Sequence, residues 1–150
     1  MRFALVLLVL AGFAALVTGC GGGGSDRLSK EEYVAAADKI CAEADAAISA
    51  LGEPTEENIE EYVANAETIA NEQLAKLRAL KPPAVDEETL NHAYDLIEEQ
   101  VGLAKQGVDA LKSQNQAEFE RINAEIQTVN AESDKIAQDY GLKECGNTNA

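Results

Sequence analysis

The three cysteines, Cys20, Cys41 and Cys145, carry the most reactive side chains of this 150-residue chain. Cys20 follows an apolar run, residues 3–17, that comes directly after one arginine. A positive charge followed by such a run is typical of a secretory signal peptide, whereas a membrane span needs about 20 apolar residues. We therefore expect residues 1–19 to direct export, so that the remaining cysteines reside in an oxidising compartment.

The residues Val17, Thr18, Gly19 and Cys20 resemble the lipobox of bacterial lipoproteins, in which an aliphatic residue, a small residue and Gly or Ala precede the modified cysteine. The resemblance implies cleavage between Gly19 and Cys20 and attachment of a diacylglyceryl group to the Cys20 sulfur. Two or three acyl chains, palmitate for example, would anchor the protein stably at the extracytoplasmic face of the cell membrane. The alternative is a secreted protein that is cut nearby and keeps Cys20 as a free thiol.

Residues 20–28 include the four glycines Gly21–Gly24, and their composition predicts a flexible tether, of which residues 21–28 span roughly 15 Å. The chain holds 12 Lys and Arg against 27 Asp and Glu, a formal net charge of −15. A chain this acidic is repelled by nucleic acid and by anionic lipid, so we expect no nucleic-acid partner. Contact with the membrane is expected through the lipid anchor.

Four helices are predicted from Leu28 onward by apolar residues at helical spacing and by their start and stop signals. They cover about 30–51, 56–81, 87–114 and 116–140. Their predicted N-caps are Ser29 with Glu32 in a capping box, Thr55, Asp86 and Asn115, and the predicted stops include Pro82-Pro83 and Gly141. Short connections force neighbouring helices to run antiparallel, so the predicted fold is an all-α, up-down-up-down four-helix bundle over 29–146, with 147–150 as a tail.

Cys41 and Cys145 form an even pair beyond the export signal, which predicts a disulfide. Cys41 lies about 18 Å along the first helix from its cap, and an extended segment from 141 to 145 reaches roughly 17 Å. The chain must therefore turn at Gly141 and run back along the first helix. A redox pair is more often CxxC, and two thiols with one distant histidine do not complete a zinc site.

Signatures of catalysis and of metal binding are sparse. His92 is the single histidine and lies four residues from Glu88, whereas a di-iron bundle takes Glu-x-x-His from two helices, so we expect His92 at the surface. The sequence lacks GxSxG, HExxH, P-loop, GxGxxG and EF-hand spacings. Acidic pairs such as Glu56-Glu57 fit solvated faces and first helical turns. We predict no enzyme, no catalytic residue, no metal and no cofactor.

Three segments, residues 40–44, Pro82-Pro83 and residues 140–146, resemble a loose group of small exported helical proteins from actinobacteria. The resemblance covers residues 29–146. It implies a helical fold and an exported location, and it supplies no catalytic residue.

Leu96 and Leu103 widen the apolar face of the third helix, which also contains Gly102. This pattern fits either close packing or a groove for a partner helix or an apolar ligand.

The function we expect is a membrane-anchored, non-enzymatic helical module that acts through protein contacts or through association with the cell envelope. The alternative is a binding protein for a small apolar or cationic ligand. An interaction module predicts an exposed stripe at Leu96 and Leu103, whereas a binding protein predicts a pocket between helices lined by these leucines or by Tyr62 and Tyr94.

Overall fold

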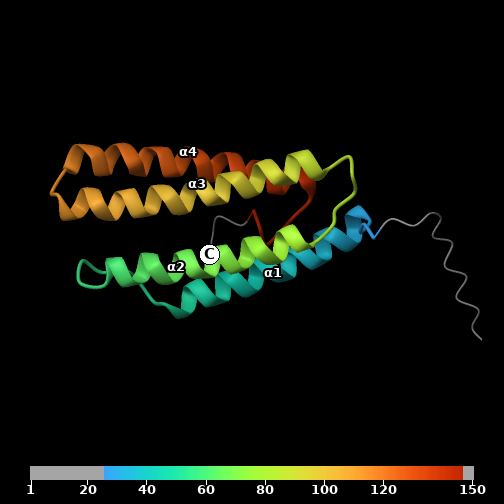
Figure 1. Ribbon diagram of the computed structural model, residues 1–150, viewed down its shortest axis with the longest axis horizontal. Coiled ribbons are helices and arrows are strands. Elements are labelled where there is room, and N and C mark those ends of the chain that lie inside the picture. Colours follow the sequence, from blue (N-terminus) through green and yellow to red (C-terminus); the bar gives the residue numbers. More distant parts are fainter. Residues whose placement is uncertain (1–25, 147–150) are drawn as a thin grey trace, which may run out of the picture.

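The computed structural model describes residues 26–146, so the predicted export signal, the lipobox with Cys20 and residues 147–150 lie outside the described range. The described chain is helical and contains no strand. Its helices are α1 (Lys30–Ala50), α2 (Ile59–Ala79), α3 (Glu87–Lys112) and α4 (Gln116–Tyr140). They form the predicted four-helix bundle, with α1 beside α2 and α3 beside α4 (Figure 1). None of these helices is long and apolar enough to cross a membrane.

The predicted caps of α1 and α4 are confirmed. The Ser29 hydroxyl accepts the N–H of Glu32, and the Glu32 carboxylate accepts the N–H of Ser29 at 2.9 Å. Asn115 Oδ1 accepts the N–H of Glu118 at 3.2 Å. α4 ends at Gly141, whose φ of 102° is a conformation that glycine adopts without a Cβ clash.

The side chains of the other two predicted caps, Thr55 and Asp86, make no capping hydrogen bond because they take other partners, although Asp86 is the N-cap residue of α3. The Thr55 N–H donates to Asn58 Oδ1 at 2.6 Å and closes a turn, so α2 begins at Ile59 rather than near 56. Asp86 precedes α3 but makes no capping hydrogen bond. Its carboxylate accepts the hydroxyl of Tyr140 at 3.0 Å, which ties the start of α3 to the end of α4.

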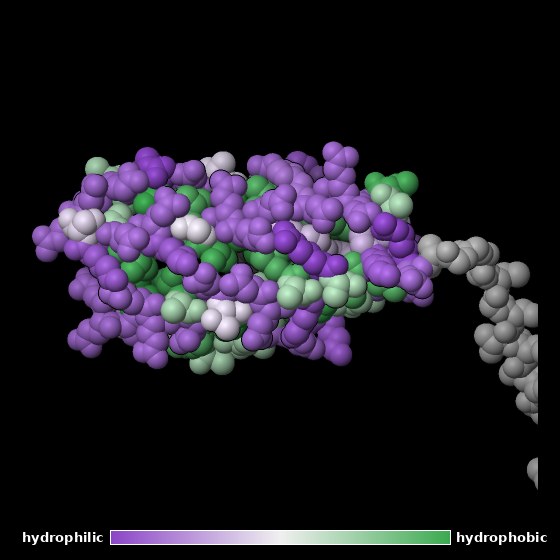
Figure 2. Space-filling view, viewed as in Figure 1, coloured by the Kyte–Doolittle hydropathy of each residue, from purple (hydrophilic) through white to green (hydrophobic). Residues whose placement is uncertain are grey.

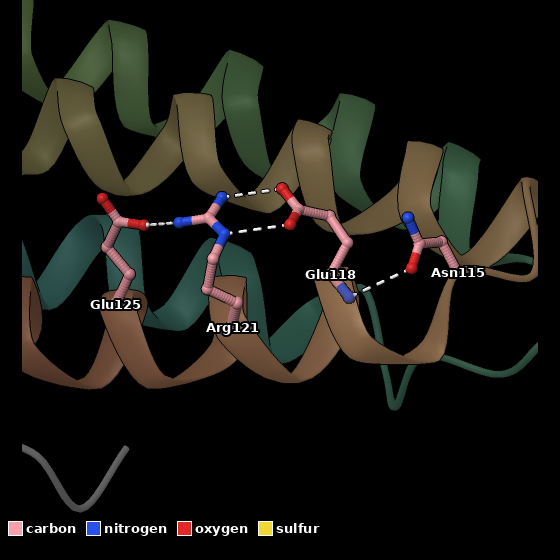
Figure 3. A network of polar contacts seen from close by, with 4 residues as sticks. All are labelled: Asn115, Glu118, Arg121 and Glu125. Atoms are coloured by element: carbon pink, nitrogen blue, oxygen red, sulfur yellow. Dashed lines mark hydrogen bonds and ion pairs between the residues drawn. The ribbon is translucent and has the colours of Figure 1, made fainter.

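A charged network covers the first turns of α4. Arg121 donates two hydrogen bonds, of 2.9 and 2.8 Å, to Glu118 and also pairs with Glu125 (Figure 3). The hydrogen bonds from Arg121 lower the pKa of Glu118. Because these side chains are exposed, the network contributes little to stability and keeps this face of the bundle hydrophilic. Figure 2 shows that hydrophilic side chains cover most of the visible surface, with hydrophobic groups showing between them.

The main core lies at the end of the bundle where α1 and α3 begin. Tyr33 and Leu90 are its most buried large side chains, at 0% and 1% exposure. The ring of Tyr33 meets that of Tyr140 edge-on, with centroids 5.7 Å apart. Side chains of α1 and α4 therefore touch at this end.

A second apolar cluster fills the interface between α3 and α4. Leu96 and Leu103 are each 5% exposed and belong to this cluster together with Ile122 and Val129. The stripe that an interaction module would expose at these leucines is therefore absent, because α4 covers them. Of the alternatives for this face, close packing is confirmed.

Residues 26–28, assigned to the tether by their composition, are instead held against the connection between α2 and α3. The Leu28 N–H donates to the Lys81 carbonyl at 2.7 Å, and Arg27 pairs with Glu87 at 2.7 Å. Asp26 pairs with Lys81 at 3.4 Å. The chain therefore enters the bundle at a fixed point beside the main core.

Candidate functional site

A disulfide joins Cys41 of α1 to Cys145, with the two Cα atoms 5.1 Å apart. The chain turns at Gly141, and the N–H of Leu142 donates to the Ala137 carbonyl at 2.9 Å. Leu142 is 8% exposed and packs into the main core. The predicted disulfide and the predicted return of the chain toward α1 are both confirmed, and Figure 1 shows this segment crossing from α4 to α1.

Asp38 of α1 holds the same segment by a contact that was not predicted. Its Oδ1 atom accepts the backbone N–H groups of Lys143 and Glu144 at 2.9 and 3.0 Å. No sequence pattern distinguishes Asp38 from the other acidic residues of α1. This contact and the disulfide together hold residues 143–145 in place between α1 and α4.

A cavity of about 410 Å³ lies beside residues 143–145, and residues of all four helices line it. This volume falls within the range of about 300 to 1,000 Å³ that is usual for small-molecule sites. Three carboxylates face the cavity, those of Asp45, Asp134 and Glu144. No Lys or Arg occurs among the residues that line it.

The carboxylates of the cavity lack charged partners within the described chain. No ion pair among residues 26–146 includes Asp45, Asp134 or Glu144. Burial raises the pKa of Asp45, and the neighbouring Glu144 carboxylate raises it further. Burial also raises the pKa of Asp134. Negative charge at these positions is therefore uncompensated by the protein, which favours the entry of a cation.

Ser133 of α4 places a hydroxyl at the same cavity. It is 8% exposed, the one buried polar residue of the described chain, and it lines both the cavity and a void of about 40 Å³ next to it. Every fully enclosed side-chain N or O atom within residues 26–146 has a hydrogen-bond partner. The Ser133 hydroxyl has none there, so it must open onto this space. A serine within the apolar stripe of the fourth helix was the sequence signal that could have indicated it.

The tyrosines predicted to line a pocket do not line this cavity. Tyr94 is 5% exposed in the main core, where its hydroxyl is hydrogen-bonded to that of Tyr33. Tyr62 is half-buried on α2, outside the cavity lining. A cavity between helices thus exists, but Leu96, Leu103 and Tyr62 do not line it. Tyr94 lines only the void of about 40 Å³ next to it.

His92 lies at the surface, as predicted, with its Nε2 atom 3.0 Å from the Glu132 carboxylate. Within the part of the chain that the structure describes, no group of three His, Cys, Asp or Glu side chains is placed to hold a metal ion.

A scan against protein-family models and searches of curated proteins and of solved structures find no match to this chain. The resemblances to lipobox proteins and to small exported helical proteins stay predictions. The geometry of the cavity is accordingly the basis for a functional proposal.

Proposed function

We propose that this protein is a lipid-anchored, non-enzymatic binding protein that takes up a small organic cation outside the cytoplasm. The observation that carries the proposal is the cavity of about 410 Å³ with three carboxylates and no basic residue in its lining. Of the two functions expected from the sequence, this favours ligand binding over contact with an envelope protein.

The negative charge of the cavity favours a positively charged ligand. Ionised carboxylates that are partly removed from water cost free energy unless a positive group neutralises them. Asp45 and Asp134 are in this condition, since burial raises the pKa of each. The net charge of −15 would also attract cations toward the protein and repel anions.

Contact through an apolar surface has less support. Leu96 and Leu103 are covered by α4, and the large hydrophobic side chains exposed in the described chain are Val85, at 89%, and Leu111, at 41%. These two residues lie before the start and near the end of α3, about 39 Å apart at 1.5 Å per residue. Two isolated side chains at that distance do not form a docking patch.

The lipid anchor rests on the lipobox resemblance and agrees with the position of the cavity. An acylated Cys20 would tether the bundle at the end where Leu28 is bonded to Lys81. Asp45 lies about 22 Å farther along α1 from Lys30, so the cavity would stand away from the lipid surface.

Calorimetry with the exported full chain tests the binding proposal. We expect organic ammonium ions to bind, and the double variant Asp45→Asn, Asp134→Asn to bind them at least about tenfold more weakly. The matched control is Glu53→Gln, Glu57→Gln, which removes the same charge from two exposed residues outside the cavity. Equal affinity in both double variants would refute the cavity as the site.

A further inference from the structure

We propose that the ligand of this cavity is an aliphatic diamine or polyamine, whose ammonium groups carry N–H bonds, and not a quaternary ammonium ion. The inference rests on the proposed cation-binding function and specifies the class of cation. It follows from which side chains line the cavity and from how its carboxylates are distributed.

Aromatic rings are missing from the cavity lining. A quaternary ammonium ion has no N–H to donate and is held in proteins by aromatic cages through cation–π contacts. Tyr33 and Tyr94 line the adjoining void of about 40 Å³, which has room for only a few water molecules, and their hydroxyls are hydrogen-bonded to each other. Tyr62 lies outside the lining of both spaces. The cavity therefore lacks the groups that recognise a quaternary ion.

Hydrogen-bond acceptors line the cavity instead. Besides its carboxylates it has the side-chain amides of Gln73, Gln100 and Asn130. The Gln73 amide nitrogen donates to Cys41 Sγ at 3.2 Å, which leaves the Gln73 oxygen to accept. A primary ammonium group has three donors and makes strong, charge-assisted hydrogen bonds to such oxygens.

The Ser133 hydroxyl is an independent indication of a polar ligand. Every fully enclosed side-chain N or O atom of residues 26–146 has a hydrogen-bond partner, so the Ser133 hydroxyl is accessible from the cavity and is not sealed in the core. Ser133 is buried to more than nine-tenths, has no partner within the described chain, and opens onto the cavity and its adjoining void. Its oxygen can accept a hydrogen bond from a ligand N–H.

The carboxylates fall into two groups, which indicates two positive charges on the ligand. Asp45 lies on α1, and Glu144 precedes Cys145, which the disulfide holds against α1. Asp134 lies on α4, which is packed along α3 and not along α1, so Asp134 and Asp45 line the cavity from different helices. α2 and α3 add the apolar side chains of Ala70, Ile97 and Val101 to the lining. Two ammonium groups joined by an alkyl chain match this combination.

Three probes separate the features of the ligand. Hexamethylenediamine has two N–H-bearing charges, hexamethonium has the same two charges and chain length without N–H, and hexylamine has one charge. Titration calorimetry with the exported full chain, its disulfide intact, should show the diamine binding at least about tenfold more tightly than either other probe. Hexamethonium binding as tightly as the diamine would overturn this inference and leave the proposed cation site standing. Failure of all three probes to bind would overturn both.

Single substitutions test which side chains bind the two ammonium groups of the diamine. Asp134→Asn should bring the affinity for the diamine down to that for hexylamine, while its affinity for hexylamine changes little. Ser133→Ala should weaken binding of the diamine and leave the affinity for hexamethonium unchanged, because hexamethonium cannot donate a hydrogen bond to the hydroxyl. Glu57→Gln serves as the exposed control, and circular dichroism checks that each variant is folded. A loss of hexamethonium binding equal to that of the diamine in Ser133→Ala would contradict the proposed N–H contact.

Discussion

Cys145 is joined to Cys41, 104 positions earlier in the chain, and both residues line the cavity that contains Asp45 and Glu144. The disulfide thus brings a carboxylate of the C-terminal segment into a site built otherwise from helices. Asp38 reinforces this arrangement by accepting the N–H of Glu144. The disulfide therefore stabilises the fold and also holds Glu144 at the candidate site.

The first prediction concerns this bond. Replacing both cysteines, Cys41→Ser with Cys145→Ser, should lower the free energy of unfolding by about 2 to 5 kcal/mol, since the bond closes a long loop in the unfolded chain. Denaturation by urea measures this, and peptide mapping without reductant should recover Cys41 linked to Cys145. An unchanged unfolding midpoint after reduction would contradict the role given to the bond.

A second prediction concerns the stability effect of Asp45. Burial and then Glu144 raise its pKa, so the folded state holds the Asp45 proton more tightly than the unfolded state does. The free energy of unfolding therefore decreases as the pH rises through the raised pKa. Asp45→Asn removes this loss and should raise the melting temperature near pH 7 but not near about pH 3, where Asp is protonated in both states. A lower melting temperature of the variant at pH 7 would instead indicate a structural partner.

The pH dependence of ligand binding gives a third prediction. An ammonium ligand favours the ionised forms of Asp45 and Asp134, whose pKa values are raised by burial. Affinity for hexamethylenediamine should therefore fall as the pH is lowered through these raised pKa values, and binding in that pH range should release protons. Calorimetry in buffers of different ionisation enthalpy measures that release. Proton uptake on binding would contradict the assignment.

A fourth prediction tests the division between core and surface. Leu90 is 1% exposed in the main core, whereas Leu111, on the same helix, is 41% exposed. Leu90→Ala should lower the free energy of unfolding by about 2 to 5 kcal/mol, and Leu111→Ala by less than about 1 kcal/mol. Similar losses in the two variants would show that the bundle is packed differently.

The fifth prediction concerns the membrane anchor. Mass spectrometry of the mature protein should find an acylated Cys20 at its amino terminus, and Cys20→Ala should leave an uncleaved precursor or release the protein from membranes. An unmodified Cys20, or a cut at another position, would refute the lipoprotein proposal and leave the cavity proposal unaffected.

Local chemistry explains which features could be predicted from the sequence. The Ser29 capping box depends on two side chains three residues apart, and the end of α4 depends on the backbone freedom of Gly141. The pairing of Cys41 with Cys145 followed from their number and from the reach of a short segment, which is a limited geometric problem. Helical periodicity likewise determined the element order and the fold class.

Tertiary structure alone decided what depends on atoms distant in sequence. Asp86 has the sequence position of a cap, yet its carboxylate binds Tyr140, 54 residues away, because the folded chain offers that hydroxyl. Leu96 and Leu103 could have faced solvent or a neighbour, and the approach of α4 buries them. The cavity joins Asp45, Asp134 and Glu144 from three segments that share no pattern. Periodicity tells which residues share a face of one helix, whereas the packing of the helices determines what that face meets.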